Sequence, residues 1–212
     1  MVKQTIVTET ATQERIPARS SPGLTRTAPS ACRQDGGDKL TTGGPNAKTK
    51  MKIGYWNVRT MYETGRLTEV TVEMKKYNIQ ILGVSESRWT ESGRFTTNTG
   101  ETILYSGRDD GQHNQGVAIV LKKGLDKCIM EWKPVNSRLM SVRLRGKHTN
   151  TTIIQCYAPT NDSDEADKDD FYNQLHAETE AAPRHDLIII MGDLNAKVGN
   201  DNTDFEDVMG TH

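Results

Sequence analysis

The sequence predicts a layered α/β sandwich of mixed sheets, and three observations lead to this fold class. A strand, an amphipathic helix and a second strand are expected between residues 52 and 84, which is a βαβ unit with parallel strands. Short strands without helices follow between residues 101 and 156, which is the pattern of antiparallel hairpins. A second helix then leads to the apolar run 187–191, so strands and helices recur in layers.

The βαβ unit starts the ordered part of the chain. Residues 52–58 alternate loosely between apolar and polar side chains and predict a first strand that ends at Asn57. Apolar side chains at helical spacing predict a helix over residues 65–78 with one buried face. These side chains are Leu67, Val70, Met74 and Tyr77. Residues 79–84 predict a second strand, which ends just before Glu86.

Five short strands are predicted in the middle of the chain. They span residues 101–106, 116–121, 128–133, 138–145 and 151–156. The fourth alternates between apolar and polar side chains, so we expect one of its faces to be buried and the other to face water. The fifth runs into Tyr157 and ends there because Pro159 cannot continue a hydrogen-bonded ladder.

A helix and an apolar strand are predicted last. The helix starts after Asp164, which suits an N-cap, and ends at Pro183. Its predicted buried stripe comprises Phe171, Tyr172, Leu175, Thr179 and Ala182. The apolar run 187–191 predicts a strand buried on both faces in the middle of a sheet. Asp193 and Asn195 follow it, and if the chain stays extended, their spacing puts both side chains on one side.

The composition predicts one domain behind a polar leader. Residues 1–50 are rich in Thr, Ser, Gly, Pro, Lys and Arg and are predicted to be disordered, because burial would not offset their ordering entropy. The domain is expected to occupy residues 51–212. The formal net charge is −1, from 27 basic and 28 acidic side chains, which gives no electrostatic case for or against nucleic acid.

The cysteines and the apolar runs predict an intracellular protein. Cys32, Cys128 and Cys156 have no paired spacing, which argues for a reducing compartment and against a disulfide framework or a zinc site. No apolar run approaches the roughly 18 residues of a membrane span. The N-terminus lacks the apolar core of a signal peptide. We therefore expect a nuclear or cytoplasmic protein that is neither secreted nor held in a membrane.

Polar side chains follow four of the predicted strands. They are Asn57, Glu86, Tyr157 with Asn161, and Asp193 with Asn195. Ligands of α/β folds bind beyond the carboxyl ends of strands, so we expect these side chains to meet. Magnesium takes oxygen ligands, often one or two carboxylates together with phosphate and water. Amides and a phenol stabilise charge on phosphorus, and a carboxylate can orient water, so the set predicts phosphoryl chemistry.

Each of these residues also has a structural interpretation. Glu86 can pair with Arg88 at the surface, where such pairs contribute little. Asn57 and Asp193 can close turns at strand ends. Tyr157 can be a core ring with a satisfied hydroxyl group. Because polar groups recur at successive strand ends, the joint pattern favours a site over four independent structural roles.

Four segments also resemble, in order, motifs of the endonuclease/exonuclease/phosphatase superfamily, whose fold is DNase I-like. The segments are Trp56–Met61, Ser85–Trp89, Tyr157–Asp162 and Gly192–Gly199, and Gln115–Ala118 and Ser137–Leu139 add to them. They are most similar to the apurinic-type endonuclease domain of non-LTR retrotransposons and to craniofacial development protein 2-like sequences. The resemblance covers residues 51–212.

The resemblance implies a role for each matching residue. Glu86 would bind a divalent metal, Mg²⁺ or Mn²⁺, and Asn57 would support that metal site. Tyr157 would contact the scissile phosphate, Asp193 would orient or activate the attacking water, and Asn195 would hold the phosphate and the nucleophile. The partner would be DNA, cut by hydrolysis of a phosphodiester bond.

The resemblance also implies a truncation. The family's domain continues to a further strand pair with a Ser-Asp-His-like motif, and this chain ends before it, so we expect impaired catalysis. His212 is not assigned the missing role, and His113, His148, His176 and His185 lie outside that motif. The alternative is an inert retroelement remnant that at most binds nucleic acid or a protein. A phosphatase acting on inositol or sphingolipid head groups ranks last, because the sequence has no basic cluster and no membrane-facing apolar patch.

Overall fold

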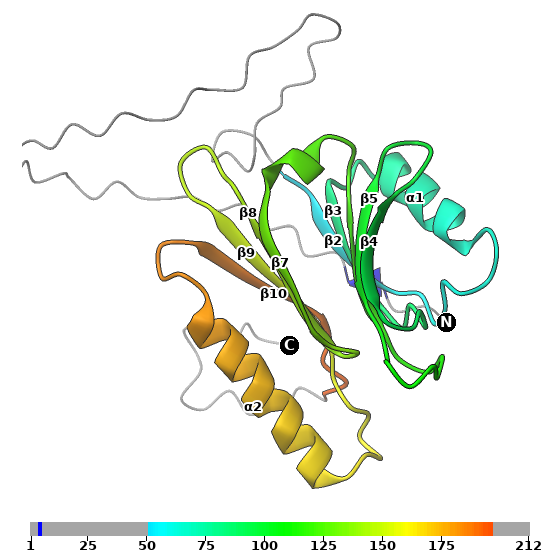
Figure 1. Ribbon diagram of the computed structural model, residues 1–212, viewed down its shortest axis with the longest axis vertical. Helices are drawn as coiled ribbons and strands as arrows, with labels where there is room; N and C mark the ends of the chain where they lie inside the picture. Colours follow the sequence, from blue (N-terminus) through cyan, green and yellow to red (C-terminus); the bar gives the residue numbers. More distant parts are fainter. Residues whose placement is uncertain (1–3, 6–50, 197–212) are drawn as a thin grey trace, which may run out of the picture.

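Two β-sheets packed face to face form the body of the protein (Figure 1). The computed structural model describes residues 4–5 and 51–196. The six-stranded sheet has the order β1-β2-β3-β6-β5-β4. Its strands are β1 (Gln4–Thr5), β2 (Ile53–Asn57), β3 (Ile81–Ser85), β4 (Ser92–Thr96), β5 (Thr102–Ser106) and β6 (Val117–Leu121).

The second sheet has four strands in the order β10-β9-β8-β7. They are β7 (Ile129–Asn136), β8 (Leu139–Leu144), β9 (Thr151–Tyr157) and β10 (Leu187–Asp193). Helices α1 (Arg66–Lys76) and α2 (Glu165–Ala181) and the 3₁₀ turn η1 (Leu125–Cys128) complete the described elements. The predicted α/β sandwich of mixed sheets is confirmed.

Successive side chains of a strand point to opposite faces of the sheet, so each strand contributes to two layers of the core. On β6, Val117, Ile119 and Leu121 point into the space between the sheets, where they meet side chains of β8 and β9. The alternate residues Ala118 and Val120 point to the opposite face and pack with α1. A strand covered on both faces therefore reads as a continuous apolar run.

Each helix covers the outer face of one sheet (Figure 1). Val70 and Met74 of α1 are buried against the six-stranded sheet, and Phe171 and Leu175 of α2 are buried against the four-stranded sheet. Both helices were predicted, but two tyrosines expected on their buried faces are exposed. Tyr77 follows the last turn of α1, and Tyr172 lies on the solvent side of the α2 stripe. Neither of these helices has the length and apolar character needed to cross a membrane.

The predicted strand pairing is largely confirmed. β2 and β3 are parallel neighbours joined through α1, and β3, β6, β5 and β4 pair antiparallel. Strand β4 was not predicted, because its sequence carries one large apolar side chain, Phe95, among small and polar residues. Apart from β1, the leader predicted for residues 1–50 lies outside the described residues, as does His212.

The position predicted for the apolar strand 187–191 is wrong. β10 pairs in parallel with β9 and has no second partner strand within residues 51–196, so it lies at the edge of the sheet there. Its alternate side chains Ile189 and Met191 pack into the core between the sheets, whereas Leu187 and Ile190 are exposed. An apolar run indicates a strand, but it does not tell an edge strand from a central one.

A buried carboxylate joins the β4–β5 hairpin to α1. Glu101 is 3% exposed, accepts hydrogen bonds from Thr97 (2.6 Å) and Thr99, and its other oxygen lies 2.9 Å from Lys75 Nζ. Burial alone would raise the pKa of Glu101, but these hydrogen bonds outweigh it and lower the pKa to about 2. The carboxylate therefore stabilises the fold above its ordinary value of 4.5, and this stabilisation is lost as the pH falls toward 2.

Glu101→Gln is expected to lower the thermal midpoint at pH 7, because the amide cannot hold Lys75 as an ion pair. Below pH 4.5 the Glu101 carboxylate of the unfolded wild-type chain becomes protonated, and near pH 2 that of the folded protein does as well, so the difference in midpoint should shrink as the pH falls from 4.5 toward 2. Thermal melts across this range check it, with the exposed Glu131→Gln as a matched control. An equal difference at pH 7 and pH 3 would contradict the role of the charge.

Candidate functional site

The carboxyl ends of β2, β3, β9 and β10 meet at one end of the sandwich. Asn57 ends β2 beside Ser85 at the end of β3, and Asp193 ends β10 beside Tyr157 at the end of β9. The two sheets are linked here, because Asn57 Nδ2 donates a hydrogen bond to Asp193 Oδ2 at 3.0 Å. Residues 136 positions apart in the sequence thus form one site.

The amide of Asn57 is the centre of this site. Its Nδ2 atom also donates to Glu86 Oε1 at 2.9 Å, so one nitrogen joins the two carboxylates. Its Oδ1 atom accepts a hydrogen bond from the backbone N–H of Arg59 at 3.1 Å, which closes the turn after β2. The turn role considered for Asn57 is therefore present together with its contacts to the carboxylates. An amide fits this position because it supplies two donors and an acceptor.

Glu86 is held in a backbone conformation that few non-glycine residues adopt. Its φ is +58°, in the left-handed region, which costs about 1 kcal/mol or more. The next residue, Ser87, fixes this turn by donating its N–H to the carbonyl of Gly116 at 3.0 Å and accepting from the N–H of Met61 at 2.9 Å. The side chain of Glu86 is 19% exposed, and Arg88 Nη2 lies 3.7 Å from it. The surroundings thus hold a carboxylate in a strained, partly buried position.

Asp193 combines a turn contact with a contact in the site. Its Oδ1 atom accepts the backbone N–H of Asn195 at 3.0 Å, while its Oδ2 atom accepts from Asn57. The chain is not extended at this point, because φ of Asn195 is +46°. The conditional expectation that extended backbone would place the two side chains together is therefore not met. Asn195 Nδ2 instead reaches the carbonyl of Ala158 at 2.7 Å.

Tyr157 faces the two carboxylates from the end of β9. Its side chain is buried, and burial followed by the negative charge of Glu86 raises the pKa of its hydroxyl group. The phenol is therefore protonated at neutral pH and acts as a hydrogen-bond donor. The guanidinium of Arg138 lies 5.1 Å from the ring centre, and its Nη1 donates to the carbonyl of Tyr157 at 3.2 Å.

A buried polar layer beneath the site was missed by the sequence reasoning. Gln155 Nε2 donates to Ser85 Oγ and to the carbonyl of Cys156, both at 3.2 Å, and Ser85 Oγ donates to the same carbonyl at 3.1 Å. These bonds tie the strand that leads to Glu86 to the strand that leads to Tyr157. The available signal was a single carboxamide, Gln155, in the otherwise apolar second half of β9.

Two other residues considered from the sequence lie apart from these contacts. Asn161 is exposed in the loop before α2, where its carbonyl accepts a hydrogen bond from Lys168 Nζ at 2.9 Å. His113 is also exposed, and its Nδ1 lies 2.7 Å from the carbonyl of Arg88. Neither side chain is hydrogen-bonded to Asn57, Glu86 or Asp193.

The donors at this site fit a hard divalent cation. Within the described residues no three side chains of His, Cys, Asp or Glu converge, so a site saturated by such ligands is absent there. Glu86 and Asp193 nevertheless present two carboxylates around one amide nitrogen. Magnesium commonly takes one or two carboxylates and completes its shell with water and phosphate, so this set suits an open site.

Comparison with known proteins supports the fold and the ancestry. The chain is 40% identical over 153 residues to craniofacial development protein 2 of Bos taurus and 39% identical to that of Tragulus javanicus, in both cases over 72% of this chain. It spans about a quarter of the length of these relatives, 25% and 26%.

Solved structures share the fold at low sequence identity. The catalytic domain of Xenopus laevis APE2 superposes with a TM-score of 0.50 at 16% identity, covering 74% of this chain and 64% of that one. D. rerio TDP2 complexed with a single-strand DNA product gives 0.50 at 12% identity, covering 69% and 61%. The model of the endonuclease/exonuclease/phosphatase family matches residues 54–207. This match spans most of the chain and includes Asn57, Glu86, Tyr157, Asp193 and Asn195, so the protein belongs to the endonuclease/exonuclease/phosphatase family.

Proposed function

We propose that the protein is a metal-dependent phosphodiesterase of the DNA endonuclease type. The observation that carries this proposal is the double hydrogen bond of Asn57, which draws Glu86 of one sheet and Asp193 of the other to one point. Glu86 and Asp193 are partly buried, and the repulsion between two neighbouring carboxylates falls when a cation or a proton lies nearby. A site for a cation and a phosphate relieves that repulsion. One protein of the same fold, D. rerio TDP2, is known in complex with a single-strand DNA product, which supports DNA as the substrate.

Glu86 and Asp193 would hold the divalent cation, Mg²⁺ or Mn²⁺, with Asn57 as the amide that orients both carboxylates. A bound divalent cation supplies charge stabilisation for a phosphate in the transition state. The neutral Tyr157 hydroxyl group would donate a hydrogen bond to a phosphate oxygen. Asp193 would also orient a water for attack on phosphorus. Asn195, fixed by its bond to Ala158, would hold the phosphate and that water.

Nicking of supercoiled plasmid tests this function. We expect relaxed circles to form with Mg²⁺ or Mn²⁺ and not with EDTA, and Asp193→Asn, purified in the same way, to lose the activity. Equal traces of nicking in wild type and variant would identify a contaminating nuclease and overturn the proposal. DNA binding without metal-dependent nicking would assign the alternative, a binding module without catalysis.

Removing the phenol hydroxyl tests the role of Tyr157 separately. Tyr157→Phe keeps the ring that packs in the core but removes the donor, so the nicking rate should fall by about 10²-fold. The exposed Tyr172 on α2 gives a matched control, and Tyr172→Phe should nick at the wild-type rate. If Tyr157→Phe nicks at the wild-type rate, the hydroxyl group has no role in catalysis and the ring serves only in packing.

A further inference from the structure

Two aromatic side chains form an exposed pair near the site. Tyr62, in the loop after β2, and His113, in the loop before β6, have ring centroids 4.1 Å apart with an angle of 40° between their planes. Tyr62 is 62% exposed and is the most exposed large hydrophobic residue in the described part of the chain. The two rings come from different loops, and neither residue is a member of the hydrophobic clusters in the described part of the chain.

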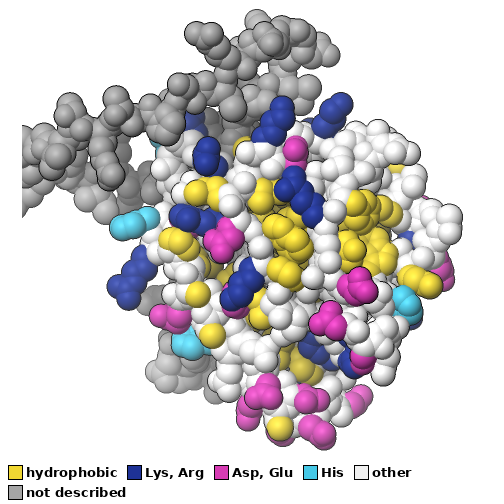
Figure 2. Space-filling model, viewed as in Figure 1, with side chains coloured by type: hydrophobic (Ala, Val, Ile, Leu, Met, Phe, Trp, Pro, Cys, Tyr) yellow, Lys and Arg dark blue, Asp and Glu magenta, His cyan; other side chains and the backbone are white. Residues whose placement is uncertain are grey.

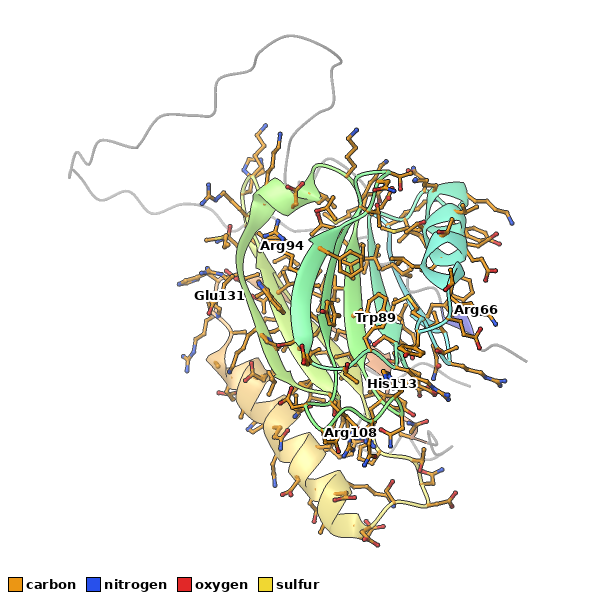
Figure 3. All side chains as sticks on the ribbon, turned by 45° about the vertical axis from the view of Figure 1, so that its right-hand side comes forward. Arg66, Trp89, Arg94, Arg108, His113 and Glu131 are labelled. Atoms are coloured by element: carbon orange, nitrogen blue, oxygen red, sulfur yellow. The ribbon has the colours of Figure 1, made fainter. Side chains whose placement is uncertain are left out.

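The loops that carry the pair are fastened to the segment after Glu86. His113 Nδ1 lies 2.7 Å from the carbonyl of Arg88, and the N–H of Met61, next to Tyr62, donates to the carbonyl of Ser87 at 2.9 Å. Both loops are therefore hydrogen-bonded to the two residues that directly follow Glu86 in the chain. Figure 3 shows His113 at the lower end of the six-stranded sheet, below α1.

Charges around the pair favour a phosphate chain on this side. Arg88 is 42% exposed, and its closest contact with Glu86 is 3.7 Å, too long for a hydrogen bond, so the guanidinium keeps donors available. Arg59 is exposed in the Tyr62 loop. Figure 2 shows acidic side chains gathered at the lower end of the molecule, over α2, where they would repel a polyanion. The loops of Tyr62 and His113 also carry the exposed carboxylates Glu63, which pairs with Arg66, Asp110, which pairs with Arg108, and Asp109. A nucleic-acid strand that enters on this side thus meets two rings, the guanidinium groups of Arg59 and Arg88, and acidic side chains of which two are paired with arginines.

We propose that Tyr62 and His113 form a stacking platform for a base of the strand cut at the Glu86–Asp193 site, so that the substrate is single-stranded or unpaired beside the cut. This inference rests on the proposed function and deepens it. Every base has a π-face that stacks on an aromatic ring without regard to sequence. In a paired duplex those faces are covered by neighbouring bases, so a platform of exposed rings selects a strand whose bases are free.

Fluorescence anisotropy with a labelled single-stranded oligonucleotide, in EDTA and at fixed salt, tests the platform without catalysis. We expect Tyr62→Ala to weaken binding about tenfold, within the range measured for one lost stacking contact, and Tyr62→Phe to stay within about twofold of wild type. Tyr172→Ala, at the exposed tyrosine on α2, is the matched control and should bind as wild type does. A duplex of the same sequence should bind wild type more weakly and should be insensitive to Tyr62→Ala.

An oligonucleotide of abasic residues separates stacking from phosphate contacts. Wild type and Tyr62→Ala should bind it equally, because the base that would stack is missing. The inference is overturned if wild type does not bind the single strand, or if Tyr62→Ala binds it as tightly as wild type does. It is also overturned if Tyr62→Ala lowers the affinity for the abasic strand and for the normal strand by the same factor. Binding that depends on Tyr62 without nicking that depends on Asp193 would overturn the proposed function alone, and the reverse result would overturn the platform alone.

Discussion

Glu86→Gln is expected to lower metal-dependent nicking by about 10³-fold or more, the loss typical of removing one member of a catalytic unit. The substitution is nearly isosteric, and its amide oxygen can still accept the hydrogen bond that Asn57 Nδ2 donates to Glu86 Oε1 at 2.9 Å. The left-handed turn at residue 86 is held by the backbone of Ser87, which the substitution leaves in place. The variant therefore removes a negative charge and preserves the geometry.

Thermal melting with and without Mg²⁺ shows whether that charge acts through a cation. A metal that binds only the folded state raises the unfolding midpoint with concentration. Wild type should show this rise, Glu86→Gln should show little or none, and the exposed Glu180→Gln, on α2, should match wild type. If Mg²⁺ raises the midpoints of wild type and Glu86→Gln equally, Glu86 is not a ligand, whatever its effect on nicking.

Most strands of the fold could be predicted from the local sequence, because successive side chains of a strand point to opposite faces and the pattern of apolar residues shows which faces are buried. The ends of β2, β3, β9 and β10 were placed within about two residues for the same reason. Their pairing partners depend on contacts between distant segments. The edge position of β10 followed from such contacts, since its apolar run looks the same in a central strand.

For the site, too, the sequence predicted which residues take part but not how they contact one another. Asn57, Glu86, Tyr157, Asp193 and Asn195 could be found because each is a polar residue at the end of a strand or within two residues after it. The sequence does not tell which of them bridges the sheets, and Asn57 has that position because its amide reaches two carboxylates. The platform of Tyr62 and His113 could not be predicted, since the two loops are brought together by hydrogen bonds to Ser87 and Arg88, which come from a third segment of the chain.

Gly192→Ala is expected to destabilise the fold by about 3 kcal/mol or more, which is a large share of a domain's stability. A Cβ atom at this position would lie 2.0 Å from the carbonyl oxygen of Cys156, its partner on β9, and φ of Gly192 is +151°. That oxygen belongs to the backbone of a buried strand and cannot move aside as a flexible side chain would. The close approach of β10 to β9 is also what sets Asp193 beside Tyr157, with Ala158 N–H donating to the carbonyl of Asp193 at 2.8 Å.

Gly65→Ala serves as a control that separates two contributions to the loss of stability, the steric clash of the added Cβ atom and the cost of a positive φ. Gly65 has φ of +92° with no atom within 4 Å of the added Cβ, so its loss should be limited to about 1 kcal/mol. Urea unfolding of wild type and both variants gives the two free energies. Equal losses would mean that β10 shifts away from Cys156 at little cost. The Asn57 bridge would then be expected to lengthen, because Asp193 moves with the strand, and nicking would fall although the fold survived. A much larger loss for Gly192→Ala than for Gly65→Ala means instead that the backbone contact between β9 and β10 fixes the position of Asp193 before any metal or DNA is bound.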